Sequence, residues 1–283
     1  NPFGSFVVTN YIDNVLMSVL TFTCKGKSIY TGNNIYELGD VYVSSKVRGG
    51  GVFFRMLRRF HKEFPEVESY GTPNKLALPT ELKVGYEQTD VGIKYNFMPL
   101  GIPFFTFLGS KITFFRPFHK FDRLVGKAVK SLLFFFKDVV CEKEKKEVSI
   151  DAEGFESGLF YKNDQYLSWR YSRSPEPYKI LVSPHNGRKV IYKKILVKNI
   201  DFIIIVDHNV KNMTDKNRLL KKLIMIEDCF GIFEMSSKTS SRFLPWFLSL
   251  SVKKIDFITY GFEFPGKASA NSVLFNAGDG DNF

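Results

Sequence analysis

The same order of strand and helix patterns occurs twice in this sequence, and this repeat constrains the fold more than any other feature. Residues 171–198 contain a proline entry, an alternating strand, a polar turn and a second strand, as residues 1–26 do. The second copy continues with a strand, a helix and a strand, which are DFIIIVD, KNRLLKKLIMIEDCF and GIFEMSS. The corresponding segments of the first copy are ELGDVYVSS, VFFRMLRRFHKEF and VESYGT. We therefore expect two tandem units of one α/β type, that is, an α+β fold with mixed sheets.

The two copies differ at their start. A helical segment, DQYLSWRY, precedes the second copy and has no counterpart before the first, so we expect the first unit to lack its opening strand and helices. We predict a first unit over residues 1–99, an aromatic and basic helical connection over 100–150, and a second unit over 151–283. Within the first unit, the pair Asp13-Asn14 predicts a hairpin turn between the opening strands.

The composition narrows the classes of function. With 44% hydrophobic residues and a net charge of +11, the chain is expected to be an ordered globular protein that attracts polyanions. No nucleic-acid-binding signature accompanies the charge, so we expect no nucleic acid partner. Three widely spaced cysteines favour a reducing compartment, the cytoplasm, and four scattered histidines give no metal site. No apolar run reaches the roughly 18 residues of a spanning helix.

A glycine loop, Arg48-Gly49-Gly50-Gly51, joins a predicted strand to a predicted helix. Glycines let backbone N–H groups approach a ligand closely, and the unpaired N–H groups of a first helical turn favour an anion such as pyrophosphate. The alternative is a glycine-rich connection with no ligand. The loop lacks the characteristic ends of nucleoside triphosphate and dinucleotide loops.

Two motifs around this loop resemble the GNAT family of acyltransferases. The first is similar to the family's R/QxxGxG/A loop through Arg48 and Gly51, with Phe53 where Gly or Ala is usual. The second is similar through Pro73, Asn74, Ala77, Leu82, Gly85 and Tyr86. Two further segments are similar to parts of the tandem acyltransferases of bacteria, namely YLSWRYSRSPEPYKIL and the closing LFNAGDGDNF. The resemblance thus implies a transferase built from two GNAT-like units.

The resemblance also implies acetyl-CoA, or another acyl-CoA, as the cofactor. In the family, the strand before the loop splays away from its neighbour and binds the pantetheine arm, and the loop holds the pyrophosphate. The residues implied here are Tyr42, Val43, Arg48, Gly49, Gly50, Gly51, Val52, Phe53 and Asn74. Asn74 has a second, compatible role as a helix N-cap. The second copy reads HNVKNMTDKNRLL at this place, without glycine, so we expect it to shape the acceptor pocket or complete the sheet.

Direct attack of an amine on a thioester requires a base, an oxyanion donor and an acid. The family places the oxyanion donor at Val43 and, in some members, a base six residues earlier, which is Glu37 here. Even spacing predicts that Glu37 and Val43 share one face of the strand, and the alternative is an exposed glutamate near the strand start. The family's thiolate-protonating tyrosine is replaced by Glu81, a departure from the pattern. We also expect Pro79 to disturb the helix that carries Glu81, and Tyr86 to serve packing.

These observations leave three functions open. The first is an N-acyltransferase that moves an acetyl or short acyl group to a primary amine, for example an amino sugar or another small metabolite, with Glu37 and Glu81 as its catalytic residues. The second is a non-enzymatic protein of the same fold that binds a ligand or partner. The third is an acyltransferase at a membrane surface, because residues 103–121 interleave phenylalanines with basic side chains; these aromatics could instead pack between the two units. The oligomeric state stays open.

Overall fold

The structure is a computed structural model of the 283-residue chain. It describes residues 1–89, 93–101, 122, 124, 126, 155, 159–175, 177–197, 200–236, 243–244, 250–255 and 258–261. The connection predicted over residues 100–150, with its aromatic and basic stretch, falls almost wholly outside the described residues. Among the described residues, no helix is long and apolar enough to cross a membrane.

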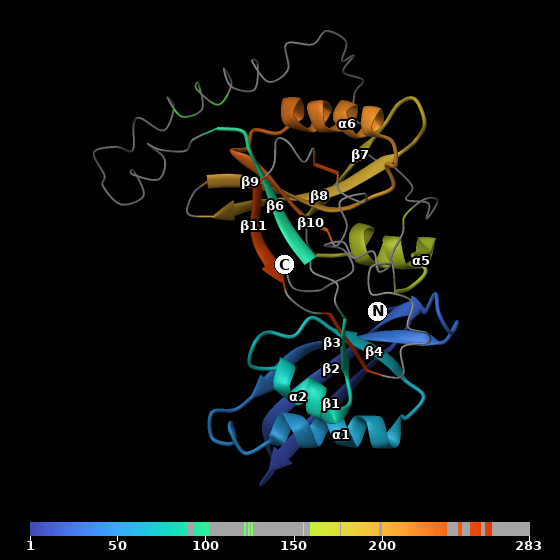
Figure 1. The fold of residues 1–283 in the computed structure, drawn as a ribbon, viewed down its shortest axis with the longest axis vertical. Helices are drawn as coiled ribbons and strands as arrows, with labels where there is room; N and C mark the ends of the chain where they lie inside the picture. Colours follow the sequence, from blue (N-terminus) through green and yellow to red (C-terminus); the bar gives the residue numbers. More distant parts are fainter. Residues whose placement is uncertain are drawn as a thin grey trace, which may run out of the picture.

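Two six-stranded mixed sheets form the molecule (Figure 1). The first sheet has the order β1 (Ser5–Ile12), β2 (Val15–Lys27), β3 (Asn34–Val43), β4 (Glu68–Gly71), β12 (Ile258–Gly261) and β5 (Glu87–Thr89). The second has the order β7 (Tyr178–Val182), β8 (Lys189–Val197), β9 (Ile200–His208), β10 (Gly231–Ser236), β6 (Ile93–Pro99) and β11 (Leu250–Ile255). The prediction of an α/β fold with mixed sheets is confirmed.

The two sheets have the same arrangement of strand directions. In each, three antiparallel strands are followed by a parallel fourth strand, and an antiparallel fifth and sixth strand complete the sheet. The strand patterns that repeat in the sequence occupy equivalent positions, with β1 to β4 matching β7 to β10. The repeat therefore extends from the sequence to the order of the sheets.

Each sheet also contains one strand from the other half of the chain. β6 lies between β10 and β11 in the second sheet, and β12 lies between β4 and β5 in the first. This reciprocal exchange links the halves through backbone hydrogen bonds. The boundaries at residues 99 and 151 stay predictions, but neither half forms its sheet from its own strands alone.

Helices from both halves of the chain lie on the outer faces of the sheets (Figure 1). Helices α1 (Val52–Glu63) and α2 (Leu78–Val84) cover the first sheet, and α6 (Met213–Ile226) covers the second. Between the sheets lie α5 (Asp164–Leu167) and the π-helical turn η2 (Ser168–Ser172). A core cluster there joins Ile35 and Tyr70 of the first sheet to Ile191 and Val206 of the second. The inner faces of the two sheets are thus packed into one core.

The predicted hairpin and first helix are confirmed. Asp13 and Asn14 have φ of 48° and 62°, the left-handed conformation that a two-residue turn between right-twisted strands requires. Helix α1 buries Val52, Met56, Leu57 and Phe60, at the apolar spacing read from the sequence. These two elements fix the outer edge of the sheet on which the candidate site is built.

Candidate active site

The parallel strands β3 and β4 separate halfway along β3. They pair from Ile35 with Glu68 to Leu38 with Gly71, and β3 then runs on to Val43 beside β2 alone. Among the described residues, no strand pairs with the other edge of residues 39–43. Backbone polar groups on such an edge can bind an extended ligand as a strand would. The splay implied by the family resemblance is therefore present in the structure.

A β-bulge at Asp40 accompanies this separation. Thr21 pairs with Gly39, but Val19 pairs with Tyr42, so β3 has one residue more than β2 between the two pairs. Asp40 has φ of 41°, which fits the extra residue of a bulge. The extra residue reverses which face the following side chains occupy.

The prediction that Glu37 and Val43 share a face of the strand is therefore wrong. Val43 packs against the core beneath α1, whereas Glu37 pairs with Thr23 and points to the opposite face. Even spacing predicts a shared face only for a regular strand, and the bulge removes that regularity.

The glycine loop leads into α1 through two residues in the left-handed region. Gly49 and Gly51 have φ of 84° and 70°, and Gly51 is the N-cap of α1 with no side-chain cap. Among the described residues, none accepts a hydrogen bond from the N–H groups of Val52 and Phe53. These groups and the helix dipole form a local positive centre.

The surroundings of the loop add to this positive charge. The first turn of α1 contains no acidic residue. Arg48 donates a hydrogen bond to the Val43 carbonyl at 3.1 Å, and Arg55 donates to the Gly50 carbonyl at 2.6 Å. The Arg48 guanidinium thus covers the last carbonyl of β3, and the Arg55 guanidinium covers a carbonyl of the loop. A pyrophosphate fits the chemistry of this loop.

The equivalent helix start in the second half has the opposite character. Asn212 is the N-cap of α6, and its side chain accepts from the Asp215 N–H at 2.7 Å. The Asp215 carboxylate lies in the first turn and accepts hydrogen bonds from the Asn186 and Asn212 amides. An internal carboxylate and cap thus occupy the place where an anion would bind.

Asn74 begins the turn that precedes α2. Its side chain accepts from the N–H groups of Leu76 at 2.9 Å and Ala77 at 3.0 Å. The helix itself begins at Leu78, later than predicted, with Pro79 in its first turn. Pro79 falls in this first turn, where its missing N–H removes no intrahelical hydrogen bond, and the residues before Leu78 form a turn in place of the predicted helix. Asn74 therefore acts as a cap of the turn, and its role toward a cofactor stays a prediction.

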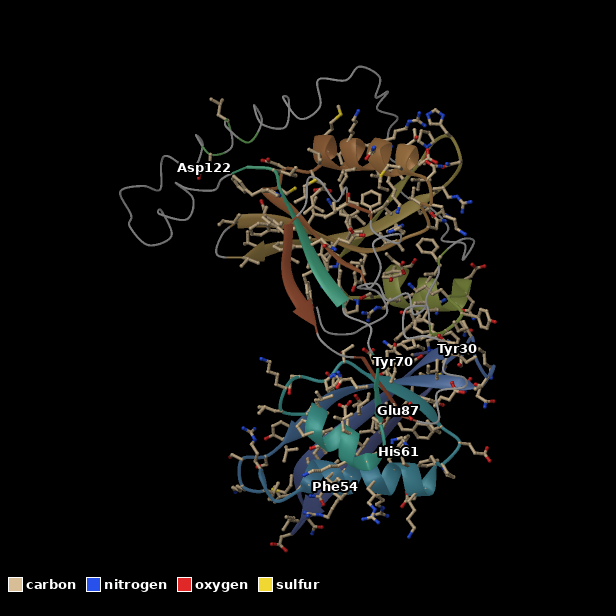
Figure 2. The ribbon with its side chains drawn as sticks, viewed as in Figure 1. Tyr30, Phe54, His61, Tyr70, Glu87 and Asp122 are labelled. Atoms are coloured by element: carbon tan, nitrogen blue, oxygen red, sulfur yellow. The ribbon has the colours of Figure 1, made fainter. Side chains whose placement is uncertain are left out.

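Glu37 is buried, with 1% of its surface exposed, so the alternative of an exposed glutamate is wrong. Its carboxylate lies 2.7 Å from the Lys25 ammonium, which lies 5.8 Å from the centre of the Trp169 ring. Lys25 belongs to β2 and Trp169 to η2, so the cation paired with this carboxylate is also close to a ring from the other half. In the register of the sheet Glu37 is opposite Tyr70, which Figure 2 labels.

Glu81 is also buried, with 3% exposed, in the first turn of α2. Near it, the Tyr86 hydroxyl lies 2.6 Å from Ser69 Oγ and 3.0 Å from His61 Nε2. Burial raises the pKa of Tyr86, the Ser69 hydrogen bond lowers it, and the Glu81 charge raises it. Burial lowers the pKa of His61. No sequence pattern predicts this cluster, because its members are separated by 8 to 25 residues and belong to no shared motif.

Among the described residues, the other reactive residue types form no comparable group. Cys24 and Cys229 are buried thiols outside any disulfide. Within the described part of the chain, no three His, Cys, Asp or Glu side chains are arranged to hold a metal ion.

Comparisons with known proteins support the fold. No family profile and no curated protein matches the sequence. A GCN5-related N-acetyltransferase from Anabaena variabilis superposes with a TM-score of 0.54 at 11% identity, over 89% of this chain and 61% of its own. A probable N-acyltransferase from Enterococcus faecalis, described as a conserved protein of unknown function, gives 0.50 at 16% identity, over 88% and 59%. The chain thus spans about three fifths of these proteins, and it has the fold of the GCN5-related N-acetyltransferases.

Proposed function

We propose that this protein is an N-acyltransferase that binds acetyl-CoA, or another short acyl-CoA, and transfers its acyl group to a primary amine. One observation carries the proposal. The unpaired edge of β3 leads directly into a glycine loop whose helix N–H groups have no acceptor among the described residues. In a GNAT fold, this combination suits a ligand with an extended amide arm and a pyrophosphate.

The residues of β3 and the loop divide the binding between them. The backbone of Tyr42 and Val43 offers hydrogen bonds to the pantetheine amides, in the manner of an added strand. The N–H groups from Gly51 to Phe53 bind the pyrophosphate, with Arg48 and Arg55 beside it. Bound acyl-CoA supplies the thioester carbon that the amine attacks.

The acid and base of the reaction are Glu81 and Glu37 in this proposal. Glu81, buried on α2, protonates the departing thiolate. Glu37 requires a change before it can accept a proton from the amine, because its carboxylate is enclosed with Lys25. Opening of that ion pair by the bound acceptor would expose it.

A second candidate function is acyl-CoA binding without turnover. The buried ion pair between Lys25 and Glu37 favours it, since a carboxylate in this state is poorly accessible to an amine. The replacement of the family's tyrosine by Glu81 points in the same direction. A third, membrane-surface function depends on residues 103–121, which lie outside the described residues.

Release of free CoA thiol in the presence of acetyl-CoA and a panel of primary amines tests the proposal. We expect amine-dependent release, with mass spectrometry showing a gain of one acetyl group on the amine. Glu81→Gln should lower kcat by about 100-fold or more. Glu63→Gln, an exposed carboxylate on α1, is the control and should leave kcat unchanged. Binding of acetyl-CoA with no acetylated amine would favour the second function.

A further inference from the structure

The cluster of Ser69, Tyr86 and His61 connects three separate elements beneath α1 and α2. Ser69 is on β4, His61 is in the last turn of α1, and Tyr86 follows the end of α2. Gly85, with φ of 111°, turns the chain at that end, so that the Tyr86 N–H bonds to the Glu81 carbonyl at 3.1 Å. The left-handed turn therefore holds the backbone of Tyr86 against that of the residue proposed as the acid.

Each member of the cluster can both donate and accept a hydrogen bond. The Tyr86 hydroxyl is the central link, with Ser69 Oγ at 2.6 Å on one side and His61 Nε2 at 3.0 Å on the other. Ser69 and Tyr86 are fully buried, whereas His61 is only partly buried. The line of hydrogen bonds thus runs from the interior to the surface of the protein. Figure 2 labels His61 near the end of α1.

We infer that Tyr86 and His61, oriented by Ser69, form a proton relay that connects Glu81 to solvent and restores its proton after each transfer. The inference rests on the proposed function. When the C–S bond breaks, its electron pair remains on sulfur, which takes the proton of the Glu81 carboxyl group. The resulting carboxylate takes a proton from Tyr86, directly or through one water, Tyr86 takes one from His61, and His61 takes one from solvent.

The electrostatics of the cluster fit a relay. Burial and the Glu81 charge raise the pKa of Tyr86, which disfavours a free phenolate. Tyr86 therefore passes on a proton while taking another, and does not act as a separate acid. Burial lowers the pKa of His61, so that its ring is neutral at neutral pH and can accept a proton from water.

The packing around His61 fixes the geometry of the relay. The His61 ring packs edge-on against Tyr86, Phe22 and Phe60, with ring centres 5.3, 6.2 and 5.5 Å apart. None of these three rings is charged at neutral pH, and the neighbours Arg58 and Lys62 on α1 are exposed. The hydrogen bond between Tyr86 and His61 is therefore the route along which the relay predicts that a change at Glu81 reaches His61.

The first test needs no turnover. NMR titration of the His61 ring is compared in the wild type, Glu81→Gln, Tyr86→Phe and the double variant. A relay predicts that Glu81→Gln shifts the His61 titration midpoint, and that this shift is lost in the Tyr86→Phe background. An unchanged midpoint in Glu81→Gln, or an equal shift in both backgrounds, would overturn the relay whatever the enzyme activity.

The second test follows the reaction. Tyr86→Phe should lower kcat by about 10-fold or more without changing the acetyl-CoA KM. His61→Ala should lose activity to a similar extent and regain part of it with added imidazole. Tyr161→Phe, which removes an exposed hydroxyl, is the control. Wild-type values of kcat in both Tyr86→Phe and His61→Ala would overturn the inference. If Tyr86→Phe does not fold, His61→Gln replaces it. Absence of activity in the wild type would instead contradict the proposed function.

Discussion

The ammonium of Lys25 lies 2.7 Å from the carboxylate of Glu37, and both side chains are almost completely buried. Removing one partner of a buried ion pair leaves the other charge in a poorly solvating environment. Glu37→Gln should therefore lower the free energy of unfolding by about 3–5 kcal/mol, measured by urea denaturation. The double variant Lys25→Met, Glu37→Gln should recover much of this loss.

The exposed pair of Arg59 and Glu63 on α1 gives a matched control, because its N–O distance is also 2.7 Å. Glu63→Gln should cost far less than Glu37→Gln, since exposed pairs at this helical spacing contribute little. Equal losses at positions 37 and 63 would contradict the buried pair.

The bulge at Asp40 gives a second prediction. A β-branched residue is strained at the observed φ of 41°, whereas glycine is not. Asp40→Val should destabilise the protein by about 1–2 kcal/mol, and Asp40→Gly should be close to neutral, by thermal or chemical denaturation. A harmless Asp40→Val would show that β3 is regular here.

The cap of α6 gives a third prediction, which concerns stability without binding. Asn212→Ala should lower the free energy of unfolding by about 0.5–2 kcal/mol, because the Asp215 N–H loses its acceptor. The acetyl-CoA affinity should stay unchanged, because the proposed site is at α1. A loss of affinity in a folded Asn212→Ala protein would place the cofactor in the second half.

The pH dependence of stability gives a fourth prediction. Burial lowers the pKa of His61 in the folded state, so the unfolded chain binds the proton more tightly. The protein should therefore lose stability as the pH falls below about 6.5, the pKa of an unperturbed histidine. His61→Gln should lose less over the same range, measured by denaturation at pH 7.5 and pH 5. Parallel curves would contradict a buried, neutral His61.

Local patterns in the sequence were sufficient for the parts of the fold that depend on neighbouring residues. The Asp13-Asn14 turn, helix α1 and the loop between β3 and α1 follow from turn chemistry, apolar spacing and glycine placement. The strand exchange could not be predicted in this way. β6 and β12 pair with strands that are about 130 or more residues away in the sequence, and their own patterns suit either sheet.

The site was predicted less completely than the fold. The glycine loop joins β3 to α1, as the resemblance implied. One bulged residue, Asp40, places the side chains of Glu37 and Val43 on opposite faces of β3. Glu37 forms its ion pair with Lys25 of a neighbouring strand, and the link between His61 and Tyr86 depends on how α1 and α2 meet. These contacts join distant residues with no shared sequence motif, so periodicity and spacing could not predict them.

Calorimetric titration of acetyl-CoA tests the central claim most directly. Gly50→Glu adds a carboxylate to the glycine loop, at a residue with ordinary φ whose new Cβ would lie 3.3 Å from the Val47 carbonyl oxygen. Thr214→Glu adds the same charge at the start of α6 and is the control. We predict saturable binding of one acetyl-CoA per chain, weakened about tenfold or more by Gly50→Glu and unchanged by Thr214→Glu. Absence of binding, or binding that Gly50→Glu leaves intact, would contradict the account.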